Sequence, residues 1–216
     1  MNDISIDIES LGTRFDAPII SIGAARFDRK TGKLGGEFYA EVDLQSAIDS
    51  GKVSADTLTW WMTQSPAARQ VFAKGNERQH LSTALRGLSD FVRGSGMASM
   101  VWGNGATFDI TILEHAYARC TTGLLPPWGY TNIRDMRTIV ECSELDPKTF
   151  ARVGAHHHAL DDAKFQAIVI SACWQQIVGN RPGAGAQPST KRAAPAKTAE
   201  LQRVVEVAVA DDTGGL

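Results

Sequence analysis

The chain has 216 residues, of which 43% are hydrophobic, and its formal net charge is −2. This length and composition are typical of one domain with a sizeable buried core, or of one domain and a tail. The slightly acidic charge argues against a sequence-independent, high-affinity nucleic-acid coat protein, which would be basic, but not against an enzyme that binds a few nucleotides through metal ions.

The sequence predicts neither a membrane span nor a secretory signal. No apolar run approaches the roughly 20 residues that cross a membrane, and the N-terminus has no basic region followed by an apolar stretch. The three cysteines, Cys120, Cys142 and Cys173, are widely spaced and form no metal or redox motif. They predict reduced thiols and therefore a cytoplasmic protein.

The first part of the chain predicts three strands in succession. They cover residues 4–9, 19–27 and 34–42, and a short hairpin loop containing Gly32 joins the second to the third. Short turns between consecutive strands imply an antiparallel meander.

The hydrophobic period then changes to that of helices. Ser54 is a predicted N-cap for a helix that carries Trp61, and Ser65-Pro66 is a second helix-start signal. The remaining predicted helices cover 81–93, 109–119, 135–145 and 160–178, with short strands at 97–102 and 131–134. The resulting fold class is α/β, with a mixed sheet of an antiparallel three-strand meander plus parallel strands, flanked by helices. This topology is similar to the ribonuclease H-like fold.

A domain boundary is expected after residue 179. Residues 1–179 contain the predicted domain, whereas 180–216 begin with a low-complexity segment rich in Gly, Ala and Pro. That composition predicts a flexible C-terminal tail.

Two acidic side chains lie on the first predicted strand. Because side chains alternate along a strand, Asp7 and Glu9 share one face, while Ile4, Ile6 and Ile8 share the other. Neighbouring carboxylates repel each other unless a cation joins them, so this strand is a candidate half of a divalent-metal site. On their own, the two acids could equally form the solvated face of an edge strand.

Further acids and a histidine follow at the starts of predicted helices. Asp109 opens a middle helix after a strand, and Asp162 lies in the first turn of the last helix, where either could simply cap the helix. His157 could be one of three adjacent surface histidines without a role, or part of a tag-like or zinc-binding cluster. Explaining each residue separately does not account for the order in which the four acids and the histidine occur along the chain.

The combination resembles the DEDDh group of 3′-5′ exonucleases, which have four acidic metal ligands and a catalytic histidine. The motifs are Asp7-Ile8-Glu9, the segment around Asp109, and His157-His158-Ala159-Leu160-Asp161-Asp162. The resemblance covers roughly residues 1–178. Asp-Ile-Glu-Ser-Leu-Gly-Thr, Ile-Ile-Ser-Ile-Gly-Ala and Thr-Trp-Trp-Met-Thr-Gln resemble a subgroup that contains phage 3′-5′ exodeoxyribonucleases and a mycobacterial exoribonuclease.

The resemblance implies hydrolysis of single-stranded DNA or RNA from the 3′ end to nucleoside 5′-monophosphates, with two Mg²⁺ ions that Mn²⁺ can replace. We expect Asp7, Glu9 and Asp162 to hold the ion that carries the attacking water. Asp7 and Asp109 would hold the second ion. His157 would be the general base, because a pKa near 6.5 leaves it neutral at physiological pH.

Two neighbours compete for these roles, namely His158 for that of His157 and Asp161 for that of Asp162. The spacing of the resembling motif selects His157 and Asp162. Consecutive residues lie about 100° apart around a helix, so Asp161 and Asp162 are not both expected to face the metals.

Substrate contacts are expected directly after the first two acids, at Ser10, Leu11, Gly12 and Thr13. Their backbone N–H groups would contact the 3′ hydroxyl or the sugar, and Leu11 would wedge against the terminal base. Either Trp60 or Trp61 is expected near the substrate, and the sequence leaves open which one. Trp61 is kept as a candidate together with Gln64, Asn104 and Phe108. Core packing suits Phe108 better than a substrate contact, and Asn104 could instead be a turn residue.

Two other functions fit parts of the pattern. A non-catalytic nucleic-acid-binding or adaptor module would share the fold, but the presence of all four acids and the histidine favours an enzyme. A ribonuclease H-type endonuclease also uses clustered acids, but the His-x-Ala-x-x-Asp spacing favours an exonuclease. The resemblance is also compatible with a homodimer, although no stripe of residues in the sequence indicates an interface.

Overall fold

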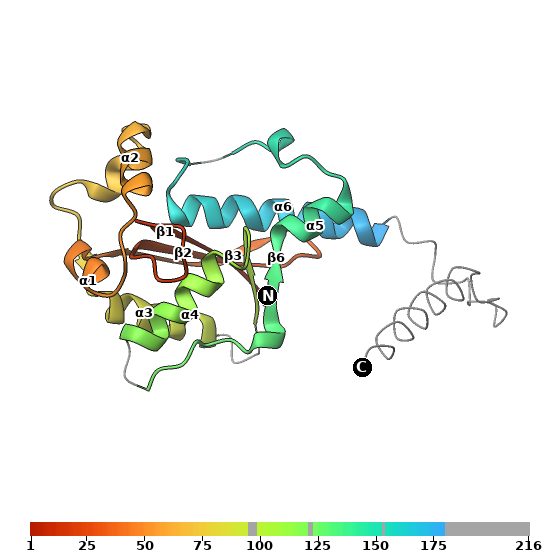
Figure 1. The fold of residues 1–216 in the computed structure, drawn as a ribbon. Helices are drawn as coiled ribbons and strands as arrows, with labels where there is room; N and C mark the ends of the chain where they lie inside the picture. Colours follow the sequence, from red (N-terminus) through yellow and green to blue (C-terminus); the bar gives the residue numbers. More distant parts are fainter. Residues whose placement is uncertain (95–98, 121–122, 153, 180–216) are drawn as a thin grey trace, which may run out of the picture. The chain divides into compact units, whose positions relative to one another are not determined.

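The computed structural model describes residues 1–94, 99–120, 123–152 and 154–179. In this part of the chain, the strands form one six-stranded sheet of order β4-β3-β2-β1-β5-β6 (Figure 1). β1 (Asp3–Ser10), β2 (Ile19–Phe27) and β3 (Leu34–Val42) pair in antiparallel fashion. The predicted meander is therefore confirmed, with two of its three strands at the predicted bounds.

The other half of the sheet is parallel. β5 (Met100–Gly103) pairs with β1, and β6 (Ile133–Asp135) pairs with β5. On the opposite edge, the two-residue β4 (Arg78–Gln79) pairs in parallel with β3. The predicted mixed sheet with flanking helices is confirmed.

Helices cover both faces of this sheet (Figure 1). α3 (Leu81–Arg93) and α4 (Asp109–Cys120) pack on one face with the isoleucines of β1 in the larger core. α5 (Met136–Ser143) and α6 (Ala159–Gly179) form a second core on the other face. This second face is the one that matters for the predicted site, because α6 carries Asp162.

The remaining elements are short, and most of them were not predicted. α2 (Ala55–Thr63) begins at the predicted N-cap, where the Ser54 side chain accepts a hydrogen bond from the Thr57 N–H. The start signal at Ser65 leads only to a 3-10 helix. The elements without a prediction are α1 (Leu44–Asp49), β4 and the 3-10 helices Tyr130–Asn132 and Pro147–Thr149.

The predictions about a membrane span and a C-terminal tail are compared with the described residues only. No helix in the described ranges is long and apolar enough to span a membrane. The predicted tail, residues 180–216, lies outside the described residues, as do the first two residues of the strand predicted at 97–102.

Side chains of β1 alternate between the two faces as predicted. Ile4, Ile6 and Ile8 lie in the core beneath α3 and α4, whereas the Ser5 hydroxyl donates a hydrogen bond of 3.2 Å to Gln166 of α6. Because side chains two residues apart share a face, Asp7 and Glu9 belong to the side that α6 covers.

Gly23 allows α6 to approach the sheet closely. It pairs with Asp7 in the register of β1 and β2. A methyl group at this position would overlap the backbone of Ala159 and Leu160 in the first turn of α6. The absence of a side chain at Gly23 therefore sets the distance between Asp7 and the helix that carries Asp162.

We predict that Gly23→Ala lowers the free energy of unfolding by about 1–3 kcal/mol, because the first turn of α6 must move away from the sheet. Denaturant unfolding measures this effect. Gly36→Ala in β3 is the matched control, since its added methyl group would lie 3.7 Å from Phe91, at ordinary contact distance. Equal stability of the two variants would contradict the proposed close approach.

Candidate active site

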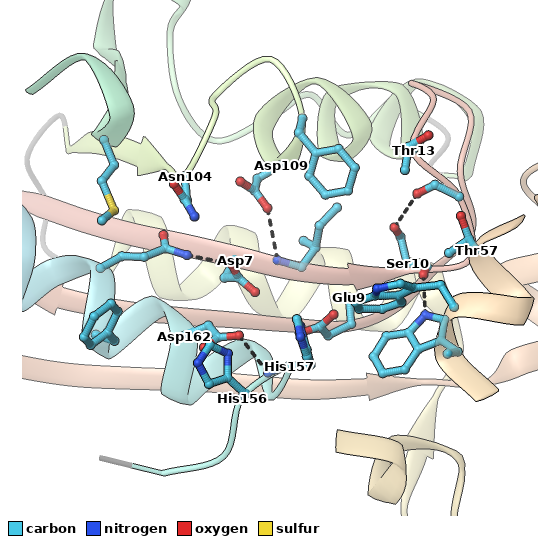
Figure 2. A pocket seen from close by; sticks show the side chains of 18 of the residues that line it. Asp7, Glu9, Ser10, Thr13, Thr57, Asn104, Asp109, His156, His157 and Asp162 are labelled. Atoms are coloured by element: carbon cyan, nitrogen blue, oxygen red, sulfur yellow. Dashed lines mark hydrogen bonds between the residues drawn. The ribbon is translucent and has the colours of Figure 1, made fainter. Parts of the chain in front are cut away.

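A pocket of about 840 Å³ brings together residues from β1, α2, α4 and α6 (Figure 2). It contains the five residues predicted to carry the chemistry, which are far apart in the sequence: Asp7, Glu9, Asp109, His157 and Asp162. In Figure 2, Asn104 lies on one side of the acids, whereas Ser10, Thr13 and Thr57 lie on the other. The pocket therefore extends to both sides of the acidic cluster.

Asp7 is at the centre of the acidic cluster. Burial raises its pKa well above the usual value, and the nearby carboxylates of Asp109, Glu9 and Asp162 raise it further. The Gln166 side-chain amide opposes this effect by donating a hydrogen bond of 2.6 Å to Asp7 Oδ1. A carboxylate in this position favours either a proton or a metal cation.

Glu9 and Asp109 are buried beside Asp7, with 7% and 2% of their surface exposed. Burial raises the pKa of Glu9 to about 8, with further contributions from Asp162 and Asp109. Burial also raises the pKa of Asp109 to about 7, although the Ile8 N–H donates a 3.4 Å hydrogen bond to its Oδ1. Near neutral pH, the metal-free cluster therefore retains protons that isolated carboxyl groups would have lost.

Asp162 connects the last helix to the loop before it. Its Oδ2 accepts a 3.0 Å hydrogen bond from the His157 N–H, and its Oδ1 forms an ion pair with Arg152. Asp161 points elsewhere: its Oδ2 accepts a 2.9 Å hydrogen bond from the Ala155 N–H. The two aspartates thus have different surroundings, as the helix geometry predicts.

Of the three adjacent histidines, His156 and His157 line the pocket with 5.5 Å between their ring centroids, whereas His158 is absent from the lining. The His157 ring lies against the Trp60 ring, with 4.9 Å between centroids, whereas His158 stacks on Tyr39 at 4.5 Å. His157 has a φ of 61°, in the left-handed region that non-glycine residues seldom adopt. Burial lowers the pKa of His157, even though the Asp162 carboxylate acts in the opposite direction.

The donor atoms fit a divalent cation. Glu9, His157 and Asp162 each have a potential ligand atom, and these atoms lie within 4.8 Å of one another. Asp7 and Asp109 are not part of this group, but their carboxylates line the same pocket, and carboxylate oxygens are the ligands that hard cations such as Mg²⁺ prefer. A cation would also offset the repulsion that raises the pKa of Asp7.

The family model described as the 3′-5′ exoribonuclease Rv2179c-like domain matches residues 2–174 of the chain. The chain belongs to this family. The match confirms the family predicted from the sequence motifs and the predicted enzyme class, a 3′-5′ exonuclease.

The comparisons with individual proteins agree with this result. The exodeoxyribonuclease of enterobacteria phage T4 is 26% identical over 164 residues, which cover 65% of this chain and 71% of the phage protein. A 3′-exonuclease that recognises the 3′ end of a histone mRNA stem-loop has a similar fold, with a TM-score of 0.55 and 13% identity over 80% of this chain and 81% of that one. The nuclease domain of 3′hExo, a DEDDh family member bound to rAMP, gives a TM-score of 0.51 and 14% identity over 80% and 91% of the two chains.

Six of the eight predicted substrate-binding residues line the pocket of the exonuclease. The pocket lining includes Ser10, Gly12, Thr13, Trp61, Asn104 and Phe108. Leu11 is instead buried in a small core with Trp61, and its N–H donates to Pro18 O, so the structure gives no support to the predicted wedge against a terminal base. Gln64 is also absent from the lining, because its side-chain amide donates back to the Trp60 carbonyl on its own helix.

The two tryptophans have different environments. Trp61 is 3% exposed, and its indole N–H donates a 2.9 Å hydrogen bond to Ser10 O, which fixes α2 to the end of β1. Trp60 is 41% exposed and also lines the pocket. Both rings thus line the pocket, and Trp60 is the exposed one of the pair, a choice that the sequence left open.

Several pocket residues of the exonuclease were missed by the sequence analysis. Gln166 is four residues beyond Asp162, so helical spacing could have placed it on the same face. The signal for Arg152 is weaker, since it lies in a loop with no regular period. The other missed lining residues include Thr57, Arg137, His156 and Phe165.

We predict that divalent cations control how the stability of the exonuclease depends on pH. The pKa values of Asp7, Glu9 and Asp109 are raised in the folded state, so the folded protein binds protons that the unfolded chain releases. Without divalent cations, the cluster should therefore destabilise the protein increasingly as the pH rises from about 5 to about 8. Mg²⁺ should raise the melting temperature more at the upper end of this range.

Asp7→Asn tests this prediction by thermal unfolding in EDTA and in Mg²⁺. The variant should be more stable than the wild type in EDTA at high pH, and it should respond less to Mg²⁺. Asp161→Asn is the control, because this neighbouring acid does not line the pocket. A wild type that becomes more stable relative to Asp7→Asn as the pH rises in EDTA would contradict the prediction.

Proposed function

We propose that this exonuclease hydrolyses single-stranded nucleic acid from the 3′ end and releases nucleoside 5′-monophosphates by a two-metal mechanism. The convergence of four carboxylates and a histidine in one pocket is the observation that supports this proposal most strongly. The structure of a neighbour bound to rAMP is consistent with a nucleoside 5′-monophosphate as product.

The carboxylates divide into two ligand groups that share Asp7. Asp7, Glu9 and Asp162 would hold one Mg²⁺ or Mn²⁺ ion, and Asp7 with Asp109 would hold the other. When bound, such ions activate the attacking water and stabilise the leaving 3′ oxygen. Gln166 contributes by orienting Asp7 through its 2.6 Å hydrogen bond.

His157 is the proposed general base. Burial lowers its pKa, so the imidazole is neutral at physiological pH and can accept a proton from water. The hydrogen bond from its backbone N–H to Asp162 holds the loop next to the acidic cluster. Trp60 and Trp61 limit the positions that the His157 ring can occupy.

The end of the pocket beside α2 suits a terminal nucleoside. It is lined by small polar groups, including Ser10, Thr13 and Thr57, together with the exposed ring of Trp60. Hydroxyl and backbone groups can bind a sugar, and an aromatic ring can stack on a base of any identity. The family description names an exoribonuclease and the phage relative is an exodeoxyribonuclease, so both sugars require testing.

We predict metal-dependent shortening of 5′-labelled single strands from their 3′ ends, measured by gel electrophoresis on RNA and DNA of equal sequence. EDTA should stop the reaction, and Asp7→Ala should abolish it, because Asp7 would contact both ions. The relative rates give the preferred sugar. A circular single strand is the control, and its cleavage would indicate an endonuclease instead.

We also predict that His157→Ala separates proton transfer from metal binding. Its turnover should fall by about 10²–10⁴-fold, while Mn²⁺ affinity measured by calorimetry should change little. The wild-type rate should fall as the pH drops below the pKa of His157, because the protonated ring cannot act as a base. A large loss of Mn²⁺ affinity would instead make His157 a metal ligand.

Asp161 and Asp162 provide a matched pair of variants for the gel assay of cleavage. Asp162→Ala should abolish cleavage, because it removes a proposed metal ligand. Asp161→Ala should reduce cleavage only mildly, because this carboxylate stabilises the loop through Ala155. The reverse pattern of activities would contradict the assignment.

A further inference from the structure

Asp162 already has a counter-ion in the structure. Its Oδ2 accepts the His157 N–H, and its Oδ1 pairs with the Arg152 guanidinium. Both oxygens are therefore engaged before any metal binds. A divalent cation that takes Asp162 as a ligand places a second positive charge beside the guanidinium, and repulsion between the two cations favours the release of Arg152.

Arg152 has a second contact that keeps it in the pocket. Its guanidinium lies over the Phe165 ring, 4.2 Å from the centroid, in a cation–π arrangement. Phe165 is three residues beyond Asp162 on α6, which places it about 4.5 Å further along the helix axis. An arginine released by Asp162 can thus remain at the pocket wall with its charge available.

The two arginines that line the pocket belong to the side formed by α5 and α6. They are Arg137 of α5 and Arg152 of the loop before α6, and α5 and α6 share a core. The part formed by α2 contributes Asp56, hydroxyl groups and aromatic rings instead. A 3′-terminal nucleoside has no phosphate on its 3′ side, so it suits the α2 end. The phosphate backbone on the 5′ side then runs toward the arginines.

We propose that Arg152 is the counter-ion of Asp162 in the metal-free protein and that metal binding releases it to contact the backbone phosphate next to the scissile one on the 5′ side. This inference rests on the proposed exonuclease function. Arginine suits the second role, because its planar group of donors matches the oxygens of a phosphate. Metal binding and strand binding then become coupled through one side chain.

Mn²⁺ titration by calorimetry, without nucleic acid, tests the first half of the proposal. Arg152→Ala should bind Mn²⁺ about threefold more tightly or better, because it removes a competing cation from Asp162. Arg134→Ala is the control, since this arginine is absent from the pocket lining and its guanidinium donates to the carbonyls of Thr131 and Ile133. Unchanged or weaker Mn²⁺ binding by Arg152→Ala, or an equal gain in Arg134→Ala, would overturn the proposal.

Oligonucleotides that carry one neutral methylphosphonate linkage test the second half. With Ca²⁺ in place of Mg²⁺ to prevent cleavage, fluorescence anisotropy measures their binding. A methylphosphonate at the first linkage on the 5′ side of the scissile one should weaken binding to the wild type about tenfold. The same substitution should have little effect on Arg152→Ala, because the phosphate contact is already lost. An equal loss in both proteins would overturn the proposal.

Two controls keep the outcomes distinct. Arg152→Gln removes the charge but keeps a polar side chain, so its Mn²⁺ affinity should match that of Arg152→Ala. If Arg152→Ala fails to fold, the glutamine variant still gives the comparison, and Mn²⁺ affinity equal to wild type would count against the proposal. Failure of the exonuclease function itself would appear as intact 3′ ends in the wild type, whereas the Mn²⁺ titration requires no turnover.

Discussion

The cost of charging carboxylates that are buried close together is the constraint on which this site depends. β1 places Asp7 and Glu9 on one face, and α4 and α6 bring Asp109 and Asp162 to the same pocket. Burial is the main cause of the raised pKa values of Asp7, Glu9 and Asp109, and repulsion from neighbouring carboxylates raises those of Asp7 and Glu9 further. Such a cluster is stable only with bound protons or cations, and this requirement connects the fold to metal-dependent chemistry.

The rest of the fold holds these groups in place. Gly23 lets the first turn of α6 approach the sheet opposite Asp7. Trp61 attaches α2 to the end of β1, next to the acids. Charge compensation at the site also involves Gln166 and Arg152, which contact Asp7 and Asp162. The site is thus a set of neighbouring elements that must pack correctly before the carboxylates can act together.

Local sequence signals were sufficient for much of this account. Alternation along β1 predicted the shared face of Asp7 and Glu9, and helix spacing separated Asp161 from Asp162. The burial of Leu11 and the choice between Trp60 and Trp61 depend on packing between α2 and β1, which no local period reveals. Arg152 was missed for a related reason, since its pairing with Asp162 depends on the path of an irregular loop.

Anomalous diffraction at the manganese absorption edge, from crystals grown with Mn²⁺ and a nucleoside 5′-monophosphate, tests the central claim most directly. Two manganese peaks that share Asp7 are expected, one next to Glu9 and Asp162 and the other next to Asp109. Arg152 should then have moved away from Asp162. A single peak, or peaks outside the acidic cluster, would contradict the proposed two-metal site.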